Sequence, residues 1–200
     1  HYSLAISEKK HFVHNTNIAC ELYFSHKSSR FDYERLARQN DALVEMSPLS
    51  WGLTHAEYKF EDGQFYLIEI GARGGGNLIS SHIVPYLSGM DTYQYLLDCS
   101  LGNISSFPFL SREPFQSRCA VLRFFDVPMN GGVVSRIEGR ELLAKKKNIA
   151  AYQFNFAPGD CIEDAKTDSD RAGFYIACCE TEQELHALME EIRQNVRIIC

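Results

Sequence analysis

From residue 54 to residue 77 the chain reads THAEYKFEDGQFYLIEIGARGGGN, and this stretch is the most informative part of the sequence. It contains two strand-like runs, one on each side of Asp62-Gly63, and apolar and polar residues alternate most clearly in the first. Alternation with a period of two is typical of β-strands, and Asp-Gly between two such runs is a strong signal for a β-hairpin. We therefore expect two antiparallel strands, followed by a loop that exposes its backbone, because Arg73 and three glycines come next.

The length of the turn sets which side chains of this hairpin share a face. Successive side chains of a strand point to opposite faces, so a three-residue loop over 61–63 places Leu67 opposite Glu57. Glu57 and Glu69 then lie on one face as diagonal neighbours, with their backbones about 7–8 Å apart. A two-residue loop would place the two glutamates on opposite faces, so this expectation depends on the register.

The residue types at the end of the hairpin are suited to binding a nucleotide and a metal ion. Mg²⁺ prefers carboxylate and phosphate oxygens together with water, and two glutamates on one face can provide the carboxylates. Arg73 can form two parallel hydrogen bonds to a phosphoryl group or a carboxylate. Glycines 74–76 allow a close approach of the backbone to a ligand and allow positive φ angles. A helix that starts near Asn77 or Leu78 would direct its N-terminus at an anion.

Each of these features has a simpler interpretation when it is taken alone. Two glutamates on a strand face are most often solvated surface charges, and an arginine followed by glycines is most often a plain loop. Their order along the chain is more specific. In this order the stretch resembles the second half of an ATP-grasp domain. Within that superfamily it is most similar to the L-amino-acid ligases that form dipeptides, which have a similar His-x-Glu strand and a Glu-x-x-Ala-Arg strand end.

The resemblance implies a role for each residue of the motif. Glu57 and Glu69 would bind Mg²⁺, or Mn²⁺ in its place, and so hold ATP. Arg73 would be the catalytic residue and would contact the phosphoryl group or the acyl-phosphate intermediate. The residues expected to contact the substrate are His55, Gly75, Gly76 and Asn77. Many ATP-grasp enzymes have an asparagine two residues after the second glutamate, where this chain has Gly71, and the amino-acid ligases vary at that position.

Composition and charge narrow the range of functions. The chain has 200 residues, a net charge of −6 and 45% hydrophobic residues. An acidic surface disfavours nucleic-acid binding, which needs Lys and Arg on the phosphates. No apolar run approaches the roughly 20 residues that cross a bilayer, and no secretory signal is visible, so we expect no membrane partner. The seven cysteines follow no zinc-site spacing. Their odd number and their apolar surroundings predict reduced, buried thiols and a cytoplasmic protein.

The rest of the chain predicts helices in its first half and mostly short strands in its second. We expect helices over 31–45, over 78–87 with an interruption at Pro85, and over 91–99 with Asp91 as the N-cap. The strands expected in the second half span 119–125, 131–137, 152–156 and 172–179. A last helix is expected from Thr181 to Val196. At the start of the chain we expect a strand over 2–6 and a turn over 7–10.

A polar connector marked by prolines, at residues 105–114, separates the two halves. The fold class expected is therefore α+β. Residues 1–110 would form the C-terminal portion of an ATP-grasp domain, an antiparallel sheet with helices, and residues 111–200 a small α+β C-terminal domain. By the resemblance, the adenine pocket and the lysine over the phosphates come from an earlier segment. We therefore expect a fragment of a longer protein, or half of a split enzyme, that is inactive alone.

The expected function is part of an ATP-dependent carboxylate–amine ligase. Its substrates would be a small-molecule carboxylate and an amine, of amino-acid or dipeptide type, joined through an acyl phosphate. One alternative is a non-catalytic binding module that joins a separate ATP-binding chain. Another is a biotin-carboxylase-like protein that acts on bicarbonate, although no biotin-carrier motif is present. Exposed strand edges in the second domain could also pair two copies into a homodimer.

Overall fold

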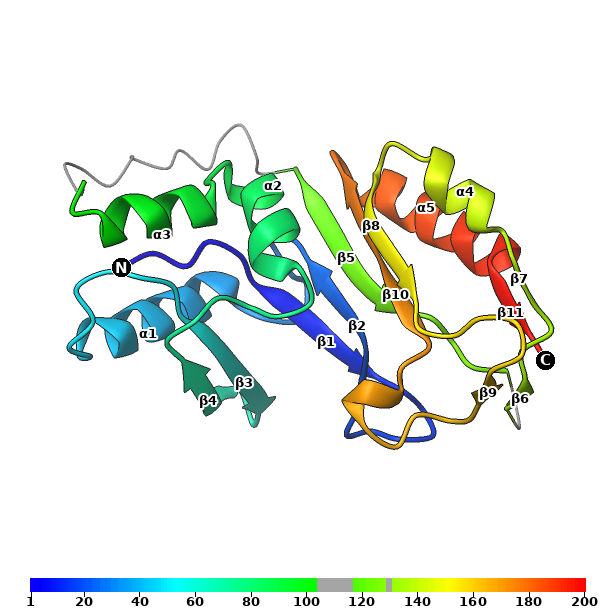
Figure 1. The fold of residues 1–200 in the computed structure, drawn as a ribbon. Coiled ribbons are helices and arrows are strands. Elements are labelled where there is room, and N and C mark those ends of the chain that lie inside the picture. Colours follow the sequence, from blue (N-terminus) through cyan, green and yellow to red (C-terminus); the bar gives the residue numbers. More distant parts are fainter. Residues whose placement is uncertain (104–116, 129–130) are drawn as a thin grey trace. The chain divides into compact units, whose positions relative to one another are not determined.

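The computed structural model describes residues 1–103, 117–128 and 131–200. These residues form two compact units, drawn as a ribbon in Figure 1. Unit 1 comprises His1–Ile6 and His26–Gln116, and unit 2 comprises Ser7–Ser25 and Ser117–Cys200. The connector predicted over 105–114 lies outside the described residues. Among the residues described, no helix combines the length and the apolar character needed to cross a bilayer.

Unit 1 contains a long helix, a β-hairpin and a group of short helices. Its elements are α1 (Tyr33–Glu45), β3 (His55–Glu61), β4 (Gln64–Gly71), the π turn η1 (Ile79–Ile83), α2 (Val84–Ser88) and α3 (Thr92–Ser100). Asp32 caps α1, because its side chain accepts a hydrogen bond from the backbone N–H of Arg35. Asp91 caps α3 in the same way, as the sequence predicts.

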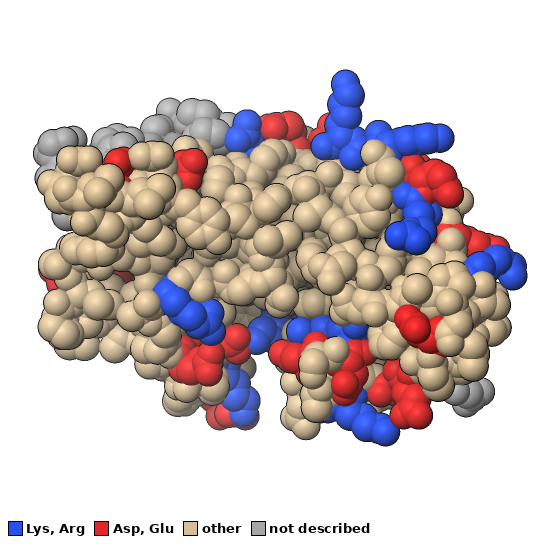
Figure 2. Space-filling model, viewed as in Figure 1, with Lys and Arg blue, Asp and Glu red and all other residues tan. Residues whose placement is uncertain are grey.

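The hairpin packs on α1 through one of its two faces. Phe60 lies between Phe65 and Phe31, with ring centroids 4.8 and 5.1 Å away. The hydroxyl of Tyr58 donates a hydrogen bond to Asn40 of α1. Because side chains alternate along a strand, Glu57 lies on the face away from α1. Figure 2 shows acidic and basic side chains close together over this hairpin.

Unit 2 is built on a five-stranded antiparallel sheet with the order β1-β2-β5-β10-β8. Its strands are β1 (Ser7–His11), β2 (Ala19–Phe24), β5 (Cys119–Phe124), β8 (Ile149–Phe154) and β10 (Gly173–Cys179). Two short pairs add β6 (Gly132–Val133) with β9 (Cys161–Ile162), and β7 (Arg136–Glu138) with β11 (Arg197–Ile199). The helices are α4 (Arg140–Lys145), α5 (Glu182–Asn195) and the 3₁₀ turn η3 (Asp168–Asp170). The α+β fold class is thus confirmed.

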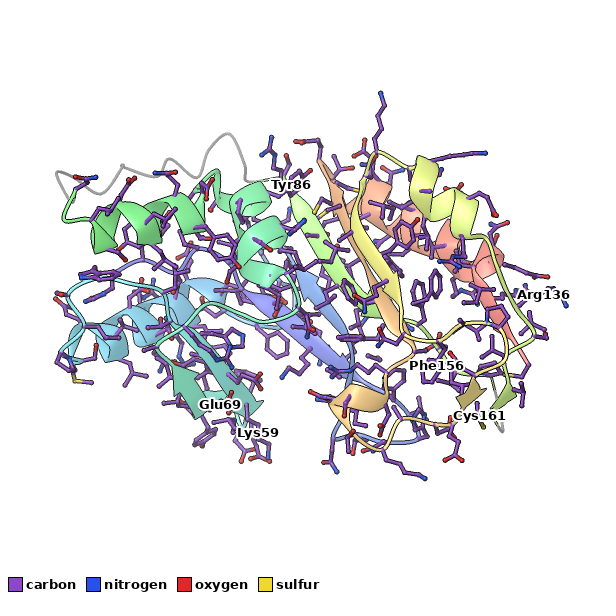
Figure 3. All side chains as sticks on the ribbon, in the orientation of Figure 1. Lys59, Glu69, Tyr86, Arg136, Phe156 and Cys161 are labelled. Carbon is purple, nitrogen blue, oxygen red and sulfur yellow. The ribbon has the colours of Figure 1, made fainter. Side chains whose placement is uncertain are left out.

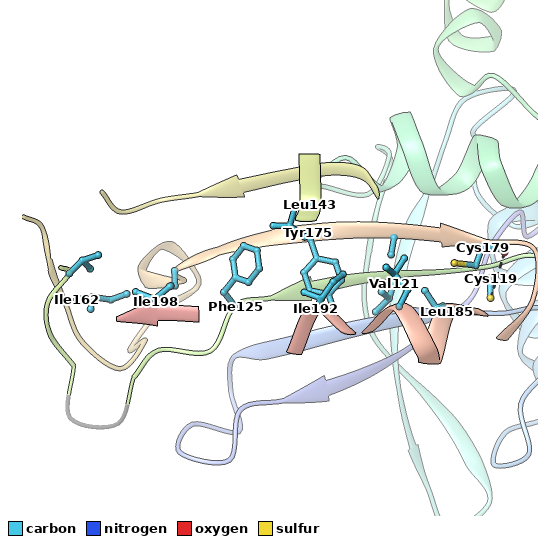
Figure 4. Packing of buried hydrophobic residues seen from close by; sticks show 14 residues of the cluster. Cys119, Val121, Phe125, Leu143, Ile162, Tyr175, Cys179, Leu185, Ile192 and Ile198 are labelled. Carbon is cyan, nitrogen blue, oxygen red and sulfur yellow. Dashed lines mark hydrogen bonds between the residues drawn. The ribbon is translucent and has the colours of Figure 1, made fainter. Parts of the chain in front are cut away.

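The main core of unit 2 lies between this sheet and α5. Leu185, Leu188 and Ile192 recur at helical spacing along α5, and all three are buried. They form one cluster with Val121 of β5 and Tyr175 of β10, as Figure 4 shows. The predicted amphipathic helix is therefore present, although it ends at Asn195 and Val196 is its C-cap.

Several predicted strands differ from the structure. Residues 2–6 are not a strand, and the segment predicted as a turn, 7–10, lies in β1, so both predictions are wrong. The cause is a partner strand, because Lys10 of β1 pairs with Glu21 of β2. The strand predicted over 131–137 is two strands, β6 and β7. It is interrupted because the N–H groups of Val134 and Ser135 donate to other segments.

The boundaries of the two compact units also differ from those expected from the sequence. Residues 7–25 belong to unit 2, because β2 pairs with β5 over Glu21–Phe24 and Ala120–Arg123. The sequential domains 1–110 and 111–200 therefore stay a prediction.

Glu21 of β2 is a buried charged residue that forms ion pairs with both neighbouring strands, β1 and β5. Its side chain is 1% exposed, and it lies 2.6 Å from Lys10 Nζ and 2.8 Å from Arg123 Nη1. Burial favours a raised pKa, but the hydrogen bonds to Lys10 and Arg123 outweigh burial and leave the pKa of Glu21 below its ordinary value. The carboxylate is therefore charged in the folded chain and stabilises it.

We expect Glu21→Gln to lower the free energy of unfolding by about 2 kcal/mol, because hydrogen bonds to a charged group are lost. A native pKa below the unfolded one means that this stabilisation is present at neutral pH. It is lost as the pH falls through the folded-state pKa. Urea denaturation at several pH values measures both effects. The control is Glu163→Gln, which removes an exposed ion pair with Lys166. Equal losses in the two variants would contradict the prediction.

Candidate functional site

The turn between β3 and β4 is a two-residue turn. Phe60 pairs with Phe65, and Glu61 pairs with Gln64, so the loop consists of Asp62 and Gly63 alone. Both loop residues have positive φ, 49° and 72°, which is typical of the turn that best matches the twist of a hairpin. The predicted three-residue loop over 61–63 is therefore wrong. Aspartate tolerates the left-handed region, so a third loop residue is not needed.

A β-bulge in β4 changes the register again before the strand ends. Tyr58 pairs with Leu67, but the next residue of β3, Glu57, pairs with Glu69. Ile68 is therefore an extra residue in β4, and its side chain is 63% exposed. Without the bulge, the two-residue turn would place Ile68 opposite Glu57, and Glu69 would lie on the other face.

Glu57 and Glu69 are thus direct cross-strand partners on the face away from α1. Directly opposite residues have Cβ atoms about 4.5–5.5 Å apart, closer than the diagonal arrangement that the sequence predicts. Glu57 is partly buried and Glu69 is exposed. Two carboxylates at this separation repel each other, so the pair favours a positively charged ligand. Figure 3 shows Glu69 and Lys59 on this hairpin.

The two carboxylates suit a hard divalent cation whose other ligands come from outside this part of the chain. Mg²⁺ prefers oxygen ligands and takes about six of them, of which carboxylates usually supply only one or two. Within the described part of the chain, no group of three or more His, Cys, Asp or Glu side chains could hold a metal ion. The remaining ligands of a cation on Glu57 and Glu69 would therefore be water or phosphate oxygens.

The loop after β4 presents Arg73 and packs its first two glycines tightly. Arg73 is exposed, and its Nη1 donates a hydrogen bond to the carbonyl of Gly74, 2.9 Å away. A Cβ added to Gly74 would lie 3.0 Å from Cβ of Ser80 and closer still to its hydroxyl. A Cβ added to Gly75 would lie 3.1 Å from Ile79 and 3.5 Å from the ring of His55.

Gly76 differs from the two glycines before it. A Cβ added there would meet no atom within 4 Å. None of the three glycines has positive φ, contrary to expectation, and the left-handed conformations fall on Asn77 and Leu78, with φ of 48° and 61°. For leucine this conformation costs about 1–2 kcal/mol. Strained backbone of this kind clusters at ligand-binding sites.

The helix that follows the loop does not begin as a regular α-helix. It starts as the π turn η1, and α2 begins at Val84. The backbone N–H of Val84 donates to the carbonyl of Ile79, five residues back. The helix predicted over 78–87 is present in this form, with Pro85 in the first turn of α2. A regular helix N-terminus directed at an anion is therefore not formed at Asn77 or Leu78.

The structure thus gathers His55, Glu57, Glu69 and Arg73 around the end of one hairpin. It places the ring of His55 beside the space in which Gly75 would carry a side chain, and leaves Gly76 and Asn77 exposed. Sequence reasoning missed Ser80, which contacts the glycine loop, and Thr92, whose hydroxyl donates to the carbonyl of Ser80. No sequence signal marks either contact, because serine and threonine are common at helix starts.

We expect Gly74→Ala to lower the free energy of unfolding by about 2 kcal/mol, because the new methyl group overlaps Ser80. Gly76→Ala is the matched control, since its methyl group points into open space, and it should change stability by less than about 0.5 kcal/mol. Thermal unfolding followed by circular dichroism measures both. A Gly76→Ala variant as unstable as Gly74→Ala would show that this description of the loop is wrong.

Comparison with known proteins identifies the second half of the chain most directly. Residues 124–200 match the family model "L-amino acid ligase C-terminal domain 2". Among curated proteins, a sequence search gives no match.

Solved structures match nearly the whole chain. The L-amino acid ligase from Bacillus licheniformis has a TM-score of 0.75 and 21% identity, with 98% of this chain and 47% of that chain covered. The phosphoribosylglycinamide synthetase from Anaerococcus prevotii has a TM-score of 0.75 and 17% identity, with 98% and 48% covered. The biotin carboxylase from Campylobacter jejuni has a TM-score of 0.62 and 12% identity, with 96% and 41% covered.

At these identities the structural matches establish the fold. The chain spans about half the length of the first two structures that it resembles. The resemblance predicted from residues 54–77 is confirmed at this level. The chain has the fold of ATP-grasp ligases, and its residues 124–200 match the family model of an L-amino acid ligase C-terminal domain.

Proposed function

We propose that this chain is the metal- and phosphate-binding part of an ATP-dependent carboxylate–amine ligase. The observation that carries the proposal is the direct pairing of Glu57 with Glu69, on the hairpin face away from α1, just before Arg73. The family match of residues 124–200 supports an amino-acid ligase in particular. Because the chain covers 47% of the Bacillus licheniformis enzyme, the activity is proposed for a complete protein that contains this chain.

Glu57 and Glu69 would hold Mg²⁺, or Mn²⁺, between their carboxylates. The ion would neutralise charge on the β- and γ-phosphates of ATP and supply the positive charge that an acidic chain lacks. The two glutamates fit this role because they face each other and each can offer an oxygen to the same cation. A structural relative, the biotin carboxylase domain of a 2-oxoglutarate carboxylase from Hydrogenobacter thermophilus, is described as a complex with MgADP and bicarbonate.

Arg73 would bind the group that is transferred. Its exposed guanidinium can form two parallel hydrogen bonds to phosphoryl oxygens or to a substrate carboxylate. In the reaction, a carboxylate oxygen attacks the γ-phosphorus and ADP leaves. The amine nitrogen of the second substrate then attacks the acyl carbon and phosphate leaves. Arg73 stabilises the charge that builds up on the transferred group, which is mostly a matter of position and electrostatics.

The neighbouring residues would shape the substrate side of the site. The ring of His55 lies where a side chain on Gly75 would meet it, and His55 shares a strand face with Glu57. Gly76 and Asn77 are exposed, and the space beside Gly76 would allow a substrate to approach the backbone. We propose amino acids as the carboxylate and amine substrates, on the basis of the ligase family match. That match favours this function over the biotin-carboxylase-like alternative.

We expect Glu69→Gln in the complete protein to reduce amino-acid-dependent ADP formation at least about 100-fold, because one carboxylate of the cation pair is lost. The fold should be unchanged, since Glu69 is exposed. A coupled assay of ADP release measures the rate, and circular dichroism checks the fold. Glu61→Gln is the control on the same hairpin, where Glu61 is half-exposed and pairs with Lys59.

Normal turnover by Glu69→Gln would show that Glu69 does not bind a metal ion that the reaction needs. Equal losses in Glu69→Gln and Glu61→Gln would mean that the hairpin as a whole, and not the glutamate pair, supports the activity.

A further inference from the structure

The π turn η1 leaves one backbone carbonyl without a helical partner, because a proline follows it in the sequence. The N–H of Val84 donates to Ile79, five residues back, instead of to Ser80. In the same register the carbonyl of Ser80 would accept from residue 85. That residue is Pro85, which has no N–H to donate. A buried carbonyl without a partner would be destabilising.

Thr92 supplies the missing hydrogen bond from another helix. Its hydroxyl donates to the carbonyl of Ser80 over 2.6 Å, and Thr92 is 1% exposed. Thr92 is the first residue of α3, and Asp91 fixes this end of α3 by accepting hydrogen bonds from the N–H groups of Tyr93 and Gln94. The position of the π turn is therefore set by the start of α3.

Ser80 in turn fixes the glycine loop. It is 5% exposed and fills the space in which Gly74 would carry a side chain. Its hydroxyl also donates to the carbonyl of Gly75, over a long 3.4 Å. The same segment of backbone accepts the hydrogen bond from Arg73, at the carbonyl of Gly74. A continuous set of contacts thus runs from Thr92 through Ser80 to the loop that carries Arg73.

We propose that Ser80 and Thr92 are positioning residues for Arg73. Neither would contact a substrate, and both act through the backbone of residues 74–76. Transferred groups must be held within a fraction of an ångström of their reactive position, so a loop that moves would lower the rate of the chemical step. This inference rests on the role proposed for Arg73, and it adds the residues that hold Arg73 in place.

The test compares Thr92→Val with Ser81→Ala in the complete protein. Thr92→Val keeps the shape of the side chain and removes the hydroxyl. Ser81 lies in the same π turn, but its hydroxyl contacts the carbonyl of Leu78 and the ring of His82. Hydrogen exchange of the backbone amides of 74–76 should accelerate about 10-fold in Thr92→Val and stay within about 2-fold in Ser81→Ala.

The kinetic measurement separates positioning from a purely structural role. We expect kcat for ADP formation to fall about 10-fold in Thr92→Val with KM for ATP unchanged, since ground-state binding is not affected. Thr92→Ser keeps the hydroxyl and should restore both kcat and the slow exchange. Ser80→Ala keeps the bond to Thr92, removes the contact with Gly75, and should change both quantities in the same direction as Thr92→Val.

Unchanged exchange at 74–76 in Thr92→Val and Ser80→Ala would overturn the proposed contacts. Faster exchange with normal kcat would overturn the positioning role. If the unaltered protein forms no ADP with any amino acid, the proposed function fails, and the exchange measurement still decides whether Thr92 and Ser80 hold the loop.

Discussion

The insertion of Ile68 into the ladder between β3 and β4 is the constraint on which the site depends. A two-residue turn followed by regular pairing would direct Glu57 and Glu69 to opposite faces of the hairpin. The bulge moves every residue after Leu67 by one position, so the two carboxylates become direct partners. Like charges placed directly opposite each other destabilise a hairpin. The cation proposed between the two glutamates would offset this repulsion.

The surroundings of the pair hold it in a defined place. The other face of the hairpin packs on α1 and on the residues just before it, through the hydrogen bond of Tyr58 to Asn40 and the contact of Phe60 with Phe31. The loop beyond the hairpin packs against Ser80. Its two residues with strained, left-handed backbone are Asn77 and Leu78. Glu57, Glu69 and Arg73 thus lie on or next to packed backbone, which the proposed binding of phosphate through a metal ion would require.

The sequence predicts the hairpin well and its details poorly. Asp62-Gly63 marks the turn, but the same pair fits a loop of two or three residues, and the choice depends on how readily aspartate adopts positive φ. The bulge has no sequence mark, since Ile68 looks like any residue of a strand. The conclusion that the two glutamates share a face is correct only because the wrong loop length and the unforeseen bulge compensate each other.

Contacts between distant segments account for the other differences. Helices with a clear cap and a regular apolar stripe, such as α3 and α5, lie close to where the sequence predicts them. By contrast, β1 is a strand because Lys10 pairs with Glu21, which also binds Arg123, 102 residues further along the chain. Such pairings depend on the folded chain, and a local pattern of polar residues does not reveal them.

A crystal structure of the complete protein with Mg²⁺ and a non-hydrolysable ATP analogue tests the central claim most directly. We expect a metal ion bound by carboxylate oxygens of both Glu57 and Glu69, at about 2.1 Å, and by phosphate oxygens of the nucleotide. A nucleotide whose metal ion contacts neither glutamate would contradict this claim.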